Sequence, residues 1–115
     1  EPFLQVVYDI SIPRMRFGRV CLIGDAAFAV RPHAAAGTAK AAEDAWTLDR
    51  NLRSGLVLDD ALDRWEVEQL ALGNDLLDRT RRIGSRSQTL NSWEPGDPEL
   101  IFGLHGPGDP EPADV

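Results

Sequence analysis

The pattern of apolar and polar residues predicts two strands near the beginning of the chain. Residues 3–10 are rich in β-branched and aromatic side chains and stop before Pro13, which is typical of a strand. Residues 19–24 contain four consecutive apolar residues without alternation. Such a run favours a strand covered on both faces, as in a parallel sheet, and the chain has few segments that could lie beside it.

The middle of the chain carries apolar residues at helical spacing and predicts two helices. The first extends from about residue 35 to residue 52 and ends before Gly55, where a C-terminal glycine is expected. Its helically spaced positions are Ala34, Ala41, Ala45, Leu48 and Leu52. The second begins at Asp59, is longer, and ends near Gln88. Its narrow stripe, which is typical of a docking face, consists of Leu58, Leu62, Trp65, Gln69, Leu72, Leu76 and Ile83.

The last part of the chain, residues 91–115, has a different composition. It holds five of the eight prolines and four of the ten glycines, so neither a helix nor a central strand can persist in it. We therefore expect residues 1–90 to form one unit and residues 91–115 to form an extended acidic arm. Its apolar residues predict that it packs onto a larger body, and they are Trp93, Leu100, Ile101, Phe102 and Leu104.

Composition and charge exclude several kinds of function. The net charge is −7, and residues 91–115 carry six acids and no base, which argues against nucleic-acid binding. No apolar run approaches the roughly 20 residues that a membrane span needs. A single cysteine, Cys21, and the absence of zinc-type spacing predict no metal site and a reducing, cytoplasmic setting. The chain begins without methionine or signal-peptide features, so we expect a piece of a longer protein.

One stretch carries candidate chemistry. A buried strand is expected to end at Gly24 and Asp25, and a loop then leads to a helix start rich in glycine and alanine. A carboxylate at the carboxyl end of a strand can accept hydrogen bonds from sugar-like hydroxyls. The helix start presents unpaired N–H groups that suit an anion or a carbonyl-rich ring edge. Together they predict a ligand in which a polyol is joined to an electron-accepting ring.

The same stretch resembles a known motif. Residues 18–27, followed by Pro32, Gly37 and residues 43–45, are similar to the second flavin-binding motif of the class A flavoprotein aromatic hydroxylases. These are FAD monooxygenases related to 4-hydroxybenzoate hydroxylase, and residues 31–40 most resemble the 2,6-dihydroxypyridine hydroxylase branch. The resemblance implies an α/β fragment, with strands followed by two major helices, from the C-terminal part of a larger Rossmann-like FAD-binding fold.

The resemblance also implies cofactor-binding positions, which are Gly24, Asp25, Pro32, Ala36, Gly37 and Thr38. Asp25 would bind the ribityl hydroxyls of FAD, and the loop at Pro32 would line the isoalloxazine ring. Backbone N–H groups at the helix start would face the pyrimidine edge of the ring. Because reduced flavin is an anion, fixed N–H dipoles stabilise it where water is excluded. No catalytic residue is assigned.

The activity implied is that of a monooxygenase. FAD would be reduced by NAD(P)H, and one oxygen atom of dioxygen would enter an electron-rich, hydroxylated aromatic or pyridine ring. The sequence departs from the family at Phe28, where many members have histidine, and at Ala34, where many have glycine. It also lacks G-x-G-x-x-G, so the half-site for the adenosine diphosphate part of FAD is missing and activity of the isolated chain stays open.

The residues of this motif also allow purely structural roles. Asp25 suits a helix or turn cap, and Gly37 suits a close helix–sheet contact. His33 is expected to contact the flavin ring or cap a helix rather than to catalyse. Cys21 is expected to be a small core residue, and the arginines at 79–86 are expected at the surface.

The expected partners are a small aromatic substrate, the missing N-terminal part of the parent protein and further copies in a homo-oligomer. The alternatives in function are another flavin enzyme, such as a reductase or halogenase, and a non-catalytic helical interaction module.

Overall fold

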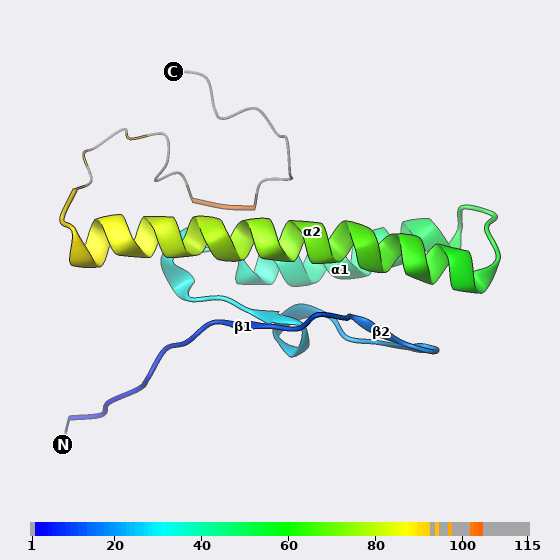
Figure 1. Cartoon of the computed structure of the whole chain (residues 1–115), viewed down its shortest axis with the longest axis horizontal. Coiled ribbons are helices and arrows are strands. Elements are labelled where there is room, and N and C mark those ends of the chain that lie inside the picture. The colour runs from blue at the N-terminus through cyan, green and yellow to red at the C-terminus, as the bar shows by residue number, and fades with distance from the viewer. Residues whose placement is uncertain (1, 93, 95–96, 98–101, 105–115) are drawn as a thin grey trace.

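Two helices packed side by side lie over a layer of short strands in the computed structural model, which describes residues 2–92, 94, 97 and 102–104 (Figure 1). The helices are α1 (Gly37–Leu52) and α2 (Leu58–Gly84). The strands are β1 (Ile10–Ser11), β2 (Arg16–Phe17), β3 (Val20–Cys21) and β4 (Phe28–Ala29). Shorter turns are η1 (Gly24–Ala26), η2 (Pro32–Ala34) and η3 (Ser85–Thr89). The expected α/β order, with strands followed by two major helices, is confirmed.

The strands form two antiparallel pairs, β1 with β4 and β2 with β3. The predicted strand at residues 3–10 is therefore wrong for all but its last residue. The predicted parallel strand at residues 19–24 is also wrong, because only Val20–Cys21 is paired and Val20 is 60% exposed. A strand covered on both faces needs neighbours on both sides, and the described part of the chain provides only the hairpin partner.

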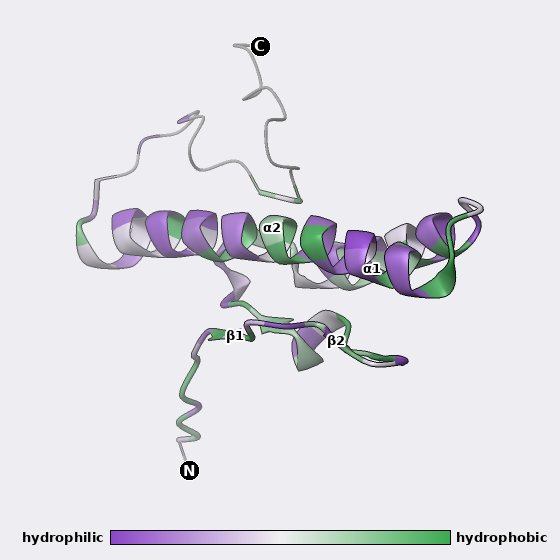
Figure 2. Ribbon diagram, turned by 45° about the vertical axis from the view of Figure 1, so that its right-hand side comes forward, coloured by the Kyte–Doolittle hydropathy of each residue, from purple (hydrophilic) through white to green (hydrophobic). Residues whose placement is uncertain are grey.

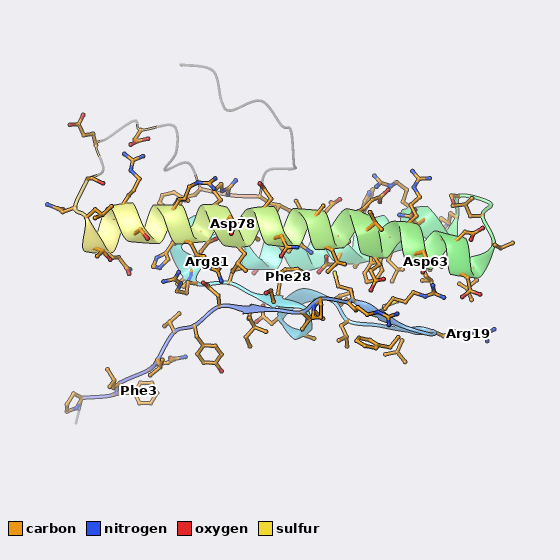
Figure 3. All side chains as sticks on the ribbon, viewed as in Figure 1. Phe3, Arg19, Phe28, Asp63, Asp78 and Arg81 are labelled. Atoms are coloured by element: carbon orange, nitrogen blue, oxygen red, sulfur yellow. The ribbon has the colours of Figure 1, made fainter. Side chains whose placement is uncertain are left out.

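The first core cluster joins the strand layer to the helices. Its fully buried members are Met15, Ala27, Phe28 and Trp65. Figure 3 shows Phe28 between the strand layer and α2. Cys21 is half-buried against this cluster, as expected of a small apolar side chain, and burial raises the pKa of its thiol.

Polar contacts attach the β2–β3 hairpin to the beginning of α2. Glu66 Oε1 accepts the backbone N–H groups of Met15 at 2.7 Å and of Arg16 at 2.8 Å. The guanidinium of Arg16 pairs with Asp59 and Asp63 on the same helix. These charge-assisted hydrogen bonds fix the hairpin on α2.

Helix α2 buries the stripe that its sequence predicts, except at Leu58, which is exposed. It ends at Gly84 and continues as the π-helical turn η3, close to the predicted end. A second core cluster forms near this end and consists of Ala34, Ala36, Leu76 and Ile83. No helix of the described residues is long and apolar enough to cross a membrane.

Two glycines inside α2 make room for rings from the preceding loops. A Cβ atom on Gly73 would lie 2.5 Å from Cε2 of Phe28, and one on Gly84 would lie 2.6 Å from Cδ2 of His33. Glycine in a helix interior costs about 1 kcal/mol relative to alanine. At these two positions the close approach of an aromatic ring explains why glycine is present.

Helix α1 turns a polar face toward the core. Its buried residues are Lys40, Asp44, Thr47 and Asn51. Of the helically spaced apolar positions, Leu48 packs against the first core cluster, whereas Ala45 and Leu52 are exposed. Lys40 and Asp44 form an ion pair whose side chains are 1% and 0% exposed. A buried charge requires such a partner because leaving water is costly.

Contacts around this pair connect three elements. The Lys40 ammonium lies 5.3 Å from the centroid of the Phe28 ring and 3.4 Å from Oε1 of Gln69. The indole Nε1 of Trp65 donates to the backbone carbonyl of Asp44 at 2.9 Å. The pair thus lies where β4, α1 and α2 meet.

Part of the predicted arm packs on the helices. Gly103 N–H donates to the carbonyl of Ala34 at 2.7 Å, and the Arg79 guanidinium donates to the carbonyl of Gly103. Leu104 packs against the second core cluster, whereas Phe102 is 66% exposed. Arg79 is half-buried instead of lying at the surface, and this burial lowers its pKa. The other apolar residues of the predicted arm, Trp93, Leu100 and Ile101, lie outside the described residues.

Replacing Gly73 by alanine should destabilise the protein although it raises helix propensity. The new methyl group must displace the buried Phe28 ring, which costs about 1–3 kcal/mol and exceeds the helical gain of about 1 kcal/mol. The exposed neighbour Asn74→Ala is the control and should be neutral or slightly stabilising. Urea unfolding measures both, and a Gly73→Ala variant more stable than the parent would contradict the packing.

Removing one charge of the buried pair should cost more than removing both. Asp44→Asn leaves the Lys40 ammonium buried without an anion, and we expect a loss of about 3 kcal/mol in the free energy of unfolding. The double variant Lys40→Met/Asp44→Asn contains no buried charge and should recover at least half of that loss. A double variant whose loss equals the sum of the losses of Asp44→Asn and Lys40→Met would show that the charges do not interact.

Candidate functional site

The turn at Gly24 and Asp25 is held against α1. Gly24 has a φ of +59°, and a Cβ atom on it would lie 3.2 Å from Cβ of Ala41, so both backbone conformation and space favour glycine. The N–H of Gly24 donates to Oδ2 of the buried Asp44 at 2.9 Å. The carboxylate that pairs with Lys40 therefore also binds the turn that precedes Asp25.

The Asp25 side chain is exposed, and no described residue forms a hydrogen bond with it. The alternative that Asp25 caps a helix is wrong, since η1, η2 and α1 all begin without a side-chain cap. A carboxylate whose lone pairs are not used by the protein can accept hydrogen bonds from ligand hydroxyls.

The N-terminus of α1 lies beside this turn and is also open. Its N-cap is Ala36, which has no side chain for capping, and its first turn contains no acid. Lys40 lies in the first turn but is buried against Asp44, so it does not occupy the helix end. The first backbone N–H groups of α1 remain directed outward with the positive end of the helix dipole.

No residue that the structure describes fills the space in front of Gly37. A Cβ atom on Gly37 would meet no atom within 4 Å, so the alternative of a close helix–sheet contact is wrong for the described residues. Thr38 is exposed, Gly37 is half-buried and Ala36 is buried. A flat ligand can therefore reach the helix start without displacing a side chain.

The loop between β4 and α1 carries local strain. Pro32 is exposed at the start of η2, whereas Ala34 is fully buried. The tight turn falls on Ala35, whose φ is +52°, and not on Ala34, the position where the family has glycine. Holding a non-glycine residue in this left-handed conformation costs about 1 kcal/mol or more, so the surrounding contacts must fix the loop.

His33 faces α2. Its ring packs against Gly84, and Nδ1 lies 3.4 Å from Nε2 of Gln88. Nε2 is buried without a hydrogen-bond partner among the described residues. The expected helix-capping role is wrong because α1 has no side-chain cap, and the expected contact with a flavin ring remains a prediction.

Sequence reasoning missed a second carboxylate next to this loop. Asp9 falls within the predicted strand at residues 3–10 and Arg31 has no predicted role, but the two form an ion pair with Nη2 and Oδ2 3.1 Å apart. Arg81 of α2 reaches the same Oδ2 atom at 3.2 Å. Residues so far apart in the chain have no fixed spacing, so no sequence motif could have revealed this contact.

The geometry brings two of the predicted features together, because the turn that carries the exposed Asp25 packs against α1, whose open start is Gly37. The exposed Pro32 lies in the turn η2, which packs on α2. A carboxylate that accepts hydrogen bonds from hydroxyls fits the ribityl chain of a flavin, and outward N–H dipoles fit the carbonyl-rich edge of its ring. No cluster of potential metal ligands occurs among the residues that the structure describes.

Comparisons with known proteins agree with this chemistry. The chain is 47% identical over 104 residues to a 2,6-dihydroxypyridine 3-monooxygenase from Paenarthrobacter nicotinovorans, a match that covers 90% of the chain and 26% of the relative. It is 38% identical over 97 residues to a salicylate hydroxylase from Pseudomonas putida, covering 84% of the chain and 20% of that relative. The chain thus spans about a quarter of the length of these relatives.

Solved structures match in the same way. The 2,6-dihydroxypyridine-3-hydroxylase from Arthrobacter nicotinovorans superimposes with a TM-score of 0.83 and 45% identity, over 90% of this chain and 26% of that one. HpxO from Klebsiella pneumoniae, complexed with FAD and uric acid, matches with a TM-score of 0.66 and 28% identity, over 72% of this chain and 22% of that one.

The sequence family described as "FAD binding domain" matches residues 7–80, which is more than half of the chain. The matched region contains the Gly24–Asp25 turn, the loop at Pro32 and the whole of α1. The chain therefore belongs to the FAD binding domain family.

Proposed function

We propose that this chain, as part of a longer enzyme, holds the ribityl and isoalloxazine parts of FAD in a monooxygenase that hydroxylates a hydroxylated aromatic or pyridine ring. The observation that carries this proposal is an exposed Asp25 beside the uncapped start of α1. Asp44 of α1 accepts the N–H of Gly24 and so holds the turn before Asp25 on this helix. The ring substrates named for the two enzyme relatives support the substrate class.

Each site residue has a defined task in this proposal. Asp25 accepts hydrogen bonds from ribityl hydroxyls, and Gly24 gives the turn that presents it. Pro32 lines one side of the isoalloxazine ring. The backbone at residues 36–38 directs N–H dipoles at the pyrimidine edge and stabilises negative charge there. Bound FAD would supply the redox chemistry, with NAD(P)H as reductant and dioxygen as oxidant.

The N-terminal segment provides a reason to expect covering partners. It projects from the body as an extended, largely apolar strip (Figure 2). Its most exposed apolar residues are Phe3, Leu4, Val6, Val7 and Tyr8. Apolar surface of this kind is usually buried against protein. The remainder of the longer enzyme is the proposed cover, further copies in a homo-oligomer are the alternative, and the reducing cytoplasm is the proposed location.

A chimera tests the proposed function. In the Paenarthrobacter nicotinovorans monooxygenase, the matching 26% is replaced by this chain. We expect a yellow protein that binds FAD and oxidises NAD(P)H faster when 2,6-dihydroxypyridine is added. A folded chimera without FAD would favour a helical interaction module. FAD binding without ring hydroxylation of any hydroxylated aromatic tested would favour a reductase or halogenase.

Asp25→Asn in this chimera should weaken FAD binding. A hydrogen bond to a charged acceptor contributes about 1.5–3 kcal/mol, so the dissociation constant of FAD should rise about 10-fold to 100-fold. Asp60→Asn is the control, because it removes the same charge from an exposed position in α2. Fluorescence titration of the apoprotein measures both, and equal affinities for the two variants would exclude Asp25 from the site.

A further inference from the structure

We propose that Asp9 is a positioning residue for the loop formed by residues 31–36, which we call the flavin loop. This inference rests on the proposed function, because it concerns how the flavin loop is aligned with the helix start. Asp9 precedes β1 and lies outside the positions that the family resemblance assigns to FAD. It acts through Arg31, the residue immediately before Pro32.

One carboxylate receives several hydrogen bonds. Oδ1 of Asp9 accepts the backbone N–H of Arg31 at 3.1 Å and its Nε at 3.2 Å. Oδ2 binds Nη2 of Arg31 at 3.1 Å and Nε of Arg81 at 3.2 Å. The Asp9 side chain is only 9% exposed. A bidentate arginine contact of this kind fixes direction as well as distance.

Because Asp9 holds the Arg31 backbone, it also orients the flavin loop that follows. Arg31 has φ −57° and ψ 149°, the extended conformation expected before proline. Since the ring of Pro32 fixes the next φ angle, the orientation of the Arg31 peptide sets the direction in which the loop leaves. The hydrogen bond to the Arg31 N–H therefore acts on the loop directly, in addition to the side-chain contacts.

The flavin loop is held by Asp9 and the neighbouring β1–β4 ladder at its Arg31 end, and by burial of Ala34 and Ala36 in the second core cluster. Ile10 pairs with Ala29 in the β1–β4 ladder, so Asp9 extends that contact toward Arg31. At the other end of the loop, Gly103 N–H binds the carbonyl of Ala34. Ala35, with its positive φ, directly follows Ala34 and precedes the buried Ala36, the N-cap of α1. A non-glycine residue keeps such a left-handed backbone conformation only where the surrounding contacts hold the loop in place.

The charge balance also depends on Asp9. Burial alone would raise its pKa, but hydrogen bonds from the Arg31 backbone, the Arg31 side chain and Arg81 lower the pKa overall. The carboxylate is thus ionised at neutral pH and balances two guanidinium groups. Figure 3 shows Arg81 on the side of α2 that faces the strand layer.

Asp9→Asn in the chimera tests the proposal. The amide retains one acceptor but presents an NH₂ group in place of the second oxygen, so the bidentate contact with Arg31 and the contact with Arg81 should be lost. We expect the dissociation constant of FAD to rise about 10-fold, the visible absorption bands of the flavin to shift, and amide hydrogen exchange of residues 31–36 in the apoprotein to quicken. More hydrogen peroxide should form per NAD(P)H oxidised, because a misplaced ring couples oxygen transfer poorly.

Asp78→Asn is the matched control. Asp78 also contacts Arg81, with Oδ1 and Nη1 3.7 Å apart, but it does not touch the flavin loop. It should leave FAD affinity within about twofold of the parent and leave the spectrum unchanged. Arg31→Lys retains the charge and the backbone N–H but loses the bidentate contact, so it should produce an intermediate spectral shift.

The outcomes separate this inference from the proposed function. If the parent chimera binds FAD and Asp9→Asn leaves both the spectrum and the amide exchange unchanged, the positioning role is wrong while the proposed function stands. If Asp9→Asn lowers the thermal midpoint as much as Asp78→Asn does and has no other effect, Asp9 is only a structural tie. A folded parent chimera that binds no FAD would overturn both proposals.

Discussion

The buried ion pair between Lys40 and Asp44 is the contact on which the rest of the structure depends. One Asp44 oxygen pairs with Lys40, the other accepts the Gly24 N–H, and its backbone carbonyl accepts the Trp65 indole. The pair therefore connects the turn before Asp25, the first turns of α1 and the centre of α2. Because a buried carboxylate is stable only when both oxygens are bound, this arrangement tolerates little displacement of any of the three elements.

Close packing of loops on α2 reinforces this arrangement. Gly73 and Gly84 let the rings of Phe28 and His33 approach the helix backbone. Phe28, at the position where the family resemblance implies histidine, fills the core and lies beside the Lys40 ammonium. The departure from the family pattern is thus explained by packing, because a buried ring at this position meets a cation and a helix glycine.

Much of the fold and part of the candidate site could be predicted from sequence. The limits of α1 and α2, the stripe of α2 and the motif around Asp25 depend on local spacing and turn chemistry, which a sequence displays directly. The strands were overestimated, because a strand exists only through its neighbours. The apolar spacing of α1 did not indicate its inner face, because Lys40 and Asp44 are buried and Ala45 is exposed. Hydrophobic spacing cannot identify a charge that is buried with its partner.

The sequence by itself determined the helix periods, the glycine turn before Asp25 and the kind of cofactor that this turn and the next helix start suit. The tertiary structure alone decided that Asp44 binds Gly24 and that Asp9 binds Arg31. It also decided that, among the described residues, no atom lies within 4 Å of where a Cβ atom on Gly37 would be. The physical reason is distance along the chain: hydrogen bonds and ion pairs between residues twenty or more positions apart follow from packing and leave no periodic signal in the sequence.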